Sequence, residues 1–165
     1  MTIMIVEDTA MMRRRLKEIL IRDLNVKEEH ITEVPNGHEA VKQYKQVNPD
    51  YVFLDIFMPG MNGVETMRQI KAMDAEAYVI MVTASASRRI VIESILAGAK
   101  DYIKKPPTLE KMARSLSIDL FNPQPKKRER TPELVNEKEK APTRDIIEEI
   151  KNDPAFESDE PMPAV

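Results

Sequence analysis

The chain of 165 residues contains no cysteine, which excludes disulfide bonds, thiolate catalysis and cysteine-based metal sites. A chain without disulfides suits the reducing environment of the cytoplasm. Long apolar runs are absent from the N-terminal segment: the run from Ile3 to Val6 ends at once in Glu7 and Asp8. Such a run is far too short for a signal peptide or a membrane span. We therefore expect a cytoplasmic protein with no membrane segment.

Glycine is scarce, and its distribution divides the chain. All four glycines precede Asn122, whereas seven of the twelve prolines follow it. We predict a folded domain over residues 1–121 and a Pro-rich, charged tail over residues 122–165. The tail holds one aromatic residue, Phe156, and disorder is the default for such a composition. Isoleucines at helical spacing leave room for a short helix near residues 143–152.

The first 121 residues alternate between short apolar runs and longer amphipathic segments. Five strand-then-helix repeats predict an α/β fold of the flavodoxin-like (βα)5 type, in which a doubly wound parallel five-stranded sheet is the middle of three layers. Gly98 is expected to end the fourth helix and Thr108 to begin the fifth. The predicted strands are residues 2–6, 30–34, 51–54, 78–82 and 101–103, and the predicted helices are residues 10–24, 37–47, 63–73, 87–97 and 108–120.

Polar residues follow the predicted strands where each strand ends. Glu7 and Asp8 follow the first strand, Asp55 the third, Thr83 the fourth, and Lys105 the fifth. Right-handed crossovers place all these ends on one edge of a parallel sheet. Converging carboxylates repel one another, and a hard divalent cation such as Mg²⁺ would relieve that repulsion. A lysine and a threonine hydroxyl beside a nucleophilic aspartate suit phosphoryl transfer.

These segments resemble the receiver domains of two-component response regulators, with unbroken order and spacing over residues 2–121. The resemblance implies that Asp55 is the phosphoacceptor, which takes its phosphoryl group from a sensor histidine kinase or a phosphotransfer protein. It also implies that Mg²⁺ is held by Glu7, Asp8, Asp55 and the backbone carbonyl of Phe57. The motifs that carry the resemblance are IVED (5–8), LDIFMPGMNG (54–63), VTA (82–84) and GAKDYIKKP (98–106).

The same resemblance assigns the remaining site residues and the output. Lys105 matches the lysine before a cis-type proline bond, Thr83 the switch hydroxyl, and Tyr102 the aromatic residue that moves with it. Their movement would bias the surface of the fourth helix, fifth strand and fifth helix between two states. No DNA-binding domain follows, so we expect a downstream protein target, as in chemotaxis-type stand-alone regulators. We further expect a monomer or a phosphorylation-dependent dimer, and no enzyme activity beyond self-catalysed phosphoryl transfer and autodephosphorylation.

Three residues depart from the family pattern. The acidic pair begins with Glu7 where aspartate is commoner, and Pro107 stands where an aromatic residue is frequent. Phe57 places a bulky apolar side chain two residues after the acceptor. We hypothesise that Phe57 limits the access of water and slows the loss of the phosphoryl group.

Other functions share parts of this pattern. A phosphate-independent pseudo-receiver scaffold would have the same fold. An aspartate-nucleophile phosphatase would need an acidic residue at Phe57, and a flavin phosphate would be repelled by the acidic loop at Glu7 and Asp8. His30 and His38 have no partner ligands nearby in the sequence and are interpreted as surface residues.

Overall fold

The protein is described here by a computed structural model, which covers residues 1–84, 87–118 and 120. Five parallel strands form one sheet in the order β2-β1-β3-β4-β5, so the predicted fold class is confirmed. The strands are β1 (Ile3–Val6), β2 (Ile31–Val34), β3 (Tyr51–Asp55), β4 (Val79–Thr83) and β5 (Asp101–Lys104). The α-helices are α1 (Ala10–Glu18), α2 (Gly37–Val47), α3 (Gly63–Met73), α4 (Arg88–Leu96) and α5 (Leu109–Ser115).

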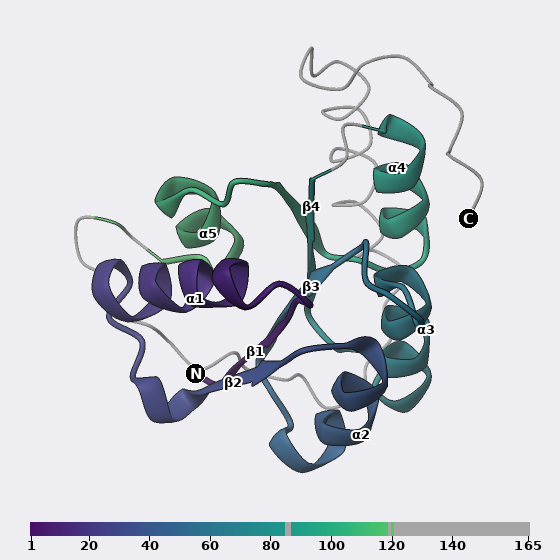
Figure 1. Cartoon of the computed structure of the whole chain (residues 1–165), viewed down its shortest axis with the longest axis horizontal. Helices are drawn as coiled ribbons and strands as arrows, with labels where there is room; N and C mark the ends of the chain where they lie inside the picture. Colours follow the sequence, from purple (N-terminus) through teal and green to yellow (C-terminus); the bar gives the residue numbers. More distant parts are fainter. Residues whose placement is uncertain (85–86, 119, 121–165) are drawn as a thin grey trace.

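The helices cover both faces of the sheet, with α1 and α5 on one face and α2, α3 and α4 on the other (Figure 1). Successive side chains of a strand point to opposite faces, so each central strand supplies both cores. In β1, Met4 and Val6 join the core beneath α2 to α4, whereas Ile3 and Ile5 join the core beneath α1 and α5. This double burial explains why the central strands are apolar at nearly every position.

Side-chain caps fix where several helices begin. Asn36, Asn62 and Thr108 each accept a hydrogen bond from a backbone N–H in the first turn of α2, α3 and α5. Thr108 therefore begins the fifth helix as predicted. Gly98, with a φ of 109°, follows the end of α4 as predicted, because glycine adopts this left-handed conformation readily.

Two predicted helices end several residues earlier in the structure as α-helices, and the fourth, predicted over residues 87–97, differs by one residue at each end. The helix expected over residues 10–24 is α-helical only to Glu18, and a π-helical segment (Ile19–Asp23) continues it. The helix expected over residues 108–120 ends at Ser115 instead. There Ser117 takes a φ of 53° and donates its N–H to the Arg114 carbonyl, while the Ile118 N–H reaches the Ala113 carbonyl. These two bonds satisfy the last carbonyls and turn the chain away from the helix axis.

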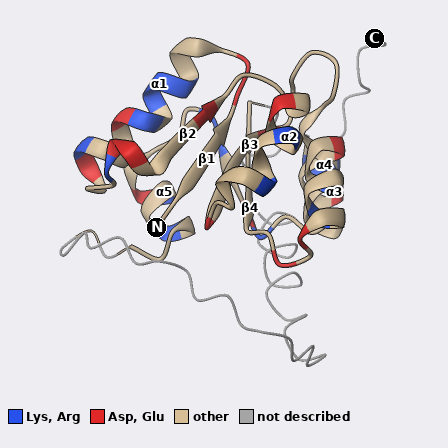
Figure 2. Ribbon diagram, turned by 90° about the horizontal axis from the view of Figure 1, so that it is seen from below, with Lys and Arg blue, Asp and Glu red and all other residues tan. Residues whose placement is uncertain are grey.

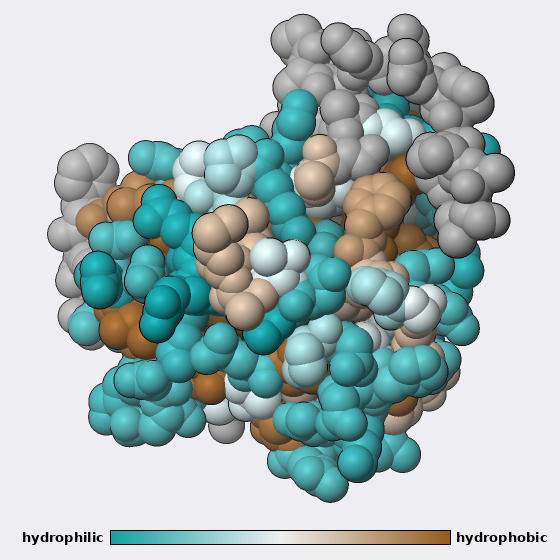
Figure 3. Space-filling model, viewed as in Figure 1, coloured by the Kyte–Doolittle hydropathy of each residue, from teal (hydrophilic) through white to brown (hydrophobic). Residues whose placement is uncertain are grey.

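Charged residues lie mainly on the helices and loops (Figure 2). The face seen in Figure 3 is largely hydrophilic, with apolar residues in small separate groups. Large apolar side chains that remain exposed include Met11, Phe57 and Leu96. The predicted tail, including the short helix near residues 143–152, lies outside the described residues.

Candidate functional site

The carboxyl ends of four strands meet at one edge of the sheet and carry the residues that the sequence singled out. Asp55 is the last residue of β3 and lies in register with Val82 of β4. Thr83, the last residue of β4, lies in register with Lys104 of β5, and its carbonyl accepts the backbone N–H of Lys105 at 2.7 Å. The strand order reverses between β1 and β3, the position at which open parallel sheets usually hold their ligands.

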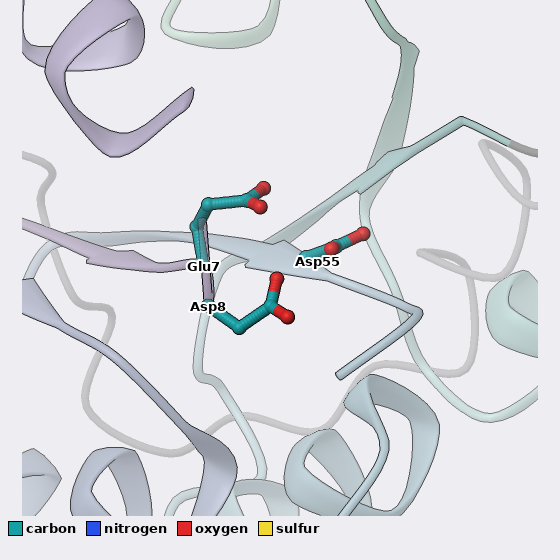
Figure 4. Close-up of side chains that lie close together, drawn as sticks. All are labelled: Glu7, Asp8 and Asp55. Atoms are coloured by element: carbon teal, nitrogen blue, oxygen red, sulfur yellow. The ribbon is translucent and has the colours of Figure 1, made fainter. Parts of the chain in front are cut away.

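Three carboxylates gather at this reversal point. One oxygen each from Glu7, Asp8 and Asp55 lies within 4.8 Å of the others. Figure 4 shows the three side chains side by side, at the ends of β1 and β3. Glu7 and Asp55 are buried, with relative exposures of 1% and 3%, whereas Asp8 is exposed. The cluster is therefore shielded from solvent at Glu7 and Asp55 and open to solvent at Asp8.

Lys105 bridges the two buried carboxylates. Its Nζ lies 2.9 Å from Oδ2 of Asp55 and 2.5 Å from Oε2 of Glu7, and its side chain is 12% exposed. The Lys105–Pro106 peptide bond is cis, as the family resemblance implied. Lys105 thus pairs with two of the three carboxylates, and Asp8 lies outside this bridge.

Backbone donors orient the same carboxylates. The Phe57 N–H donates to Oδ1 of Asp55, and the Thr9 N–H donates to Oε1 of Glu7, both at 3.3 Å. Each buried acid therefore offers one oxygen to Lys105 and the other to the backbone of the loop that follows it.

Burial dominates the protonation behaviour of the site. It raises the pKa of the Asp55 carboxyl above the ordinary value, and the hydrogen bond and charge of Lys105 only partly oppose this. The pKa of Glu7 is also raised, first by burial and further by the negative charge of Asp55. For Lys105, burial alone would lower the pKa, but its two carboxylate partners outweigh that effect and raise it. An additional cation would stabilise both acids in their charged forms.

The donor set fits a hard divalent cation. Carboxylate oxygens at this spacing match the preference of Mg²⁺ for oxygen ligands, and the exposed side of the cluster leaves room for the waters that Mg²⁺ retains. The carboxylates of Glu7, Asp8 and Asp55 would hold the ion. The predicted ligand role of the Phe57 carbonyl stays a prediction.

The two predicted switch residues lie beside this edge at different depths. Thr83 is fully buried. Tyr102 is half-buried on β5 and packs against the core beneath α2 to α4. Phe57, whose backbone N–H donates to Asp55, exposes 44% of its surface. The sheet thus brings Thr83 and Tyr102 onto adjacent strands, and their roles as a switch stay a prediction.

His30 and His38 take no part in the acidic cluster. His38 is exposed on α2, and His30 is half-buried in a short 3₁₀ turn (Glu28–His30) before β2. Their interpretation as residues outside the site agrees with these positions.

One residue near the site escaped the sequence reasoning. Nη1 of Arg13, on α1, donates to the backbone carbonyls of Glu7 and Asp8 at 2.5 and 3.0 Å. The only signal for it in the sequence is an arginine placed one helical turn after the acidic pair, and Arg14 and Arg15 beside it weaken that signal.

Comparisons with known proteins agree with this architecture. The model of the response regulator receiver domain matches residues 3–117. The chemotaxis protein CheY of Bacillus subtilis (strain 168) is 40% identical over 118 residues, which cover 72% of this chain and 96% of that protein. The CheY of Thermotoga maritima is 43% identical over 104 residues, covering 63% of this chain and 84% of that protein.

A solved structure shows the same likeness in three dimensions. A chain in the crystal structure of the CheX-CheY-BeF₃-Mg²⁺ complex from Borrelia burgdorferi is 31% identical to this chain and has a TM-score of 0.61. The match covers 69% of this chain and 84% of that one.

Among the described residues, no helix combines the length and the apolar character needed to cross a membrane. The strand order, the acidic cluster with its bridging lysine, and the match over residues 3–117 agree with one another. The chain belongs to the response regulator receiver domain family.

Proposed function

We propose that Asp55 accepts a phosphoryl group from the phosphohistidine of a sensor histidine kinase or phosphotransfer protein, in a Mg²⁺-dependent reaction. The observation that carries the proposal is the position of its carboxylate, which is buried at the end of β3, lies 2.9 Å from Nζ of Lys105 and belongs to the acidic cluster. A nucleophilic carboxylate beside a fixed cation suits attack on an anionic phosphoryl group.

The transfer exchanges one bond to phosphorus for another. An Asp55 oxygen forms a bond to phosphorus, the P–N bond of the donor phosphohistidine breaks, and the donor imidazole leaves with the electron pair and takes up a proton. Lys105 is placed to neutralise charge on the phosphoryl oxygens. Mg²⁺, held by Glu7, Asp8 and Asp55, would supply further charge neutralisation at the transferring group.

The product acyl phosphate would act as a signal through Thr83 and Tyr102. The new charge at Asp55 attracts the hydroxyl of Thr83, which vacates space that Tyr102 fills. The surface formed by α4, β5 and α5 then shifts towards the form that binds a downstream protein target. The CheY relatives and the CheX-CheY complex support a protein target of the chemotaxis type. The chain acts as a monomer or as a phosphorylation-dependent dimer.

We do not propose turnover of an external substrate. The only chemistry assigned to the chain is its own phosphorylation and autodephosphorylation, because Phe57 occupies the position where a phosphatase of this kind needs an acid. Its side chain, 44% exposed and two residues after Asp55, would hinder an attacking water. Replacement of Phe57 by Asn tests this: faster loss of the phosphoryl group is expected, and equal rates would dispose of the idea.

Intact-mass measurement after incubation with Mg²⁺ and acetyl phosphate tests the proposal. We expect one phosphoryl adduct that requires Mg²⁺ and is absent from Asp55→Asn. Because Glu7 is also a buried carboxylate paired with Lys105, Glu7→Gln is the matched control. It should still form the adduct, at a higher Mg²⁺ requirement. A folded wild-type protein that forms no adduct would favour the phosphate-independent scaffold.

A further inference from the structure

The loop between β1 and α1 carries two of the three acids, yet no side-chain cap secures its helical end. Thr9 occupies the position before α1 and makes no capping hydrogen bond to the first turn, and the first turn contains no acidic residue. By contrast, Asn36 and Asn62 cap α2 and α3 through their side chains. The conformation of the acidic loop must therefore be fixed by other contacts.

Arg13 supplies such contacts. It lies in the second turn of α1, and its Nη1 donates to the carbonyls of both Glu7 and Asp8, at 2.5 and 3.0 Å. Its backbone N–H also donates to the Thr9 carbonyl at 3.0 Å, but this is the ordinary i→i−4 bond of the helix, which any non-proline residue would make. The side chain of Arg13 therefore binds the backbone of the two acids, Glu7 and Asp8. Hydrogen bonds to a charged donor are stronger than neutral ones, which favours a fixed loop.

We infer that Arg13 is a positioning residue for the divalent cation: it holds the backbone of the two acids so that their carboxylates converge with Asp55 before the ion arrives. This inference rests on the proposed function, because it concerns the Mg²⁺ of that site. Mg²⁺ requires near-ideal geometry from its ligands, so a loop free to move by a fraction of an ångström binds it less well. The exposed Asp8 is the ligand most dependent on this support.

The positive charge of Arg13 and its hold on the loop would have opposite effects on the affinity for Mg²⁺, so an experiment can separate them. If Arg13 acted only as a nearby positive charge, its removal would reduce repulsion of Mg²⁺ and tighten binding. If Arg13 positions the loop, its removal weakens binding. Arg14 is the matched control, since it is the next residue of α1, carries the same charge and is exposed, and since its side chain makes no hydrogen bond or ion pair with any residue that the structure describes.

The experiment is calorimetric titration of the full chain with MgCl₂ at constant ionic strength, for wild type, Arg13→Ala and Arg14→Ala. We expect Arg13→Ala to raise the Kd for Mg²⁺ about tenfold, the lower end of what loss of an outer-shell contact does to metal sites. Arg14→Ala should leave the Kd within about twofold of wild type, because exposed charges have small effects. Arg13→Gln, which keeps a donor but not the charge or the reach, serves as the second variant should Arg13→Ala not fold.

A second readout separates positioning from general stability. Phosphoryl-adduct formation by Arg13→Ala should need more Mg²⁺ but reach the wild-type rate at saturation, because Asp55 and Lys105 are untouched. A Kd for Arg13→Ala or Arg13→Gln equal to or tighter than that of Arg14→Ala would overturn the inference, even with a lower melting temperature. A wild-type chain that binds no Mg²⁺ would instead overturn the proposed function itself, and this inference with it.

Discussion

Replacing Gly63 with alanine tests how closely α3 packs on the acceptor strand. Gly63 is the first residue of α3, and its N–H donates to the carbonyl of Ile56 at 2.9 Å. A Cβ at this position would lie 2.8 Å from the carbonyl carbon of Asp55 and 2.8 Å from Cα of Ile56, and it would contact the Asp55 carbonyl oxygen still more closely. All three atoms are backbone, so no side-chain rotation relieves the overlap.

The expected loss of stability follows from these contacts. Carbon atoms in van der Waals contact prefer a separation of about 3.5–4.0 Å, so β3 and α3 would have to move apart by several tenths of an ångström or more. Overpacking of this kind destabilises a protein by about 1–3 kcal/mol, and we place Gly63→Ala at the upper end, about 3 kcal/mol, because the obstruction is backbone. Gly60 is the control: its φ is 76°, yet a Cβ there would meet no atom within 4 Å. Backbone strain alone predicts about 1–2 kcal/mol for Gly60→Ala.

Urea denaturation of the full-length variants, followed by circular dichroism, measures both values. Gly63→Ala should lose more free energy of unfolding than Gly60→Ala, and it should also form the phosphoryl adduct more slowly, since it displaces the backbone of Asp55 itself. A misplacement of about 1 Å is enough to slow a reaction about 10²-fold. Equal stability losses, or a larger loss for Gly60→Ala, would refute the claim that backbone contact at Gly63 fixes the position of β3.

Three further predictions concern the charged site and a helix cap. Burial raises the pKa of Asp55, so at a pH between the ordinary pKa of 3.8 and the raised one the metal-free folded protein keeps a proton that the unfolded chain has released. The stability contributed by this group is therefore full below the ordinary pKa and falls as the pH rises through the raised one. Asp55→Asn should therefore stabilise the metal-free protein at pH 7 and flatten this pH dependence, as urea denaturation in EDTA across the pH range would measure; a less stable variant would contradict the burial argument. Addition of Mg²⁺ at about 100 times its Kd should raise the free energy of unfolding of the wild type by about 2.7 kcal/mol, and chelation by EDTA should remove that gain; an identical unfolding curve with and without Mg²⁺ would show that no such site forms. Thr108→Ala removes the cap of α5 and should cost about 1 kcal/mol while leaving the Kd for Mg²⁺ unchanged, measured by thermal melting and calorimetry; a weakened Kd would mean that α5 and the acidic cluster are coupled.

The sequence allowed the sheet to be predicted because burial on two faces leaves little choice of residue. Apolar runs such as residues 51–54 have the length and composition of central strands, and strict alternation with helices implies a parallel sheet. The parallel sheet then implies that Glu7, Asp55 and Lys105 meet, since each ends or follows a strand. The topology of the sheet alone therefore predicts that these three residues lie together, before any individual contact is known.

Helix ends were harder to predict because they depend on local backbone hydrogen bonds. Ser117 lies within an amphipathic pattern that favours continuation of the helix, yet it takes a left-handed conformation. Burial of Ile118 against the core beneath α1 and α5 accompanies the turn, and that contact exists only once the sheet is assembled. A tertiary contact therefore overrides the local pattern at this position.

Arg13 shows the same limit within the site. Sequence reasoning finds groups whose chemistry is conspicuous, such as a carboxylate at the end of an apolar strand. It cannot choose among three consecutive arginines, because each is compatible with a solvated helix face. The choice is made by geometry: the second turn of α1 places the side chain of Arg13, and not that of Arg14, within reach of the carbonyls of Glu7 and Asp8. Side chains that act on the backbone of a site, rather than on its ligand, leave almost no trace in residue type, so their discovery requires the fold.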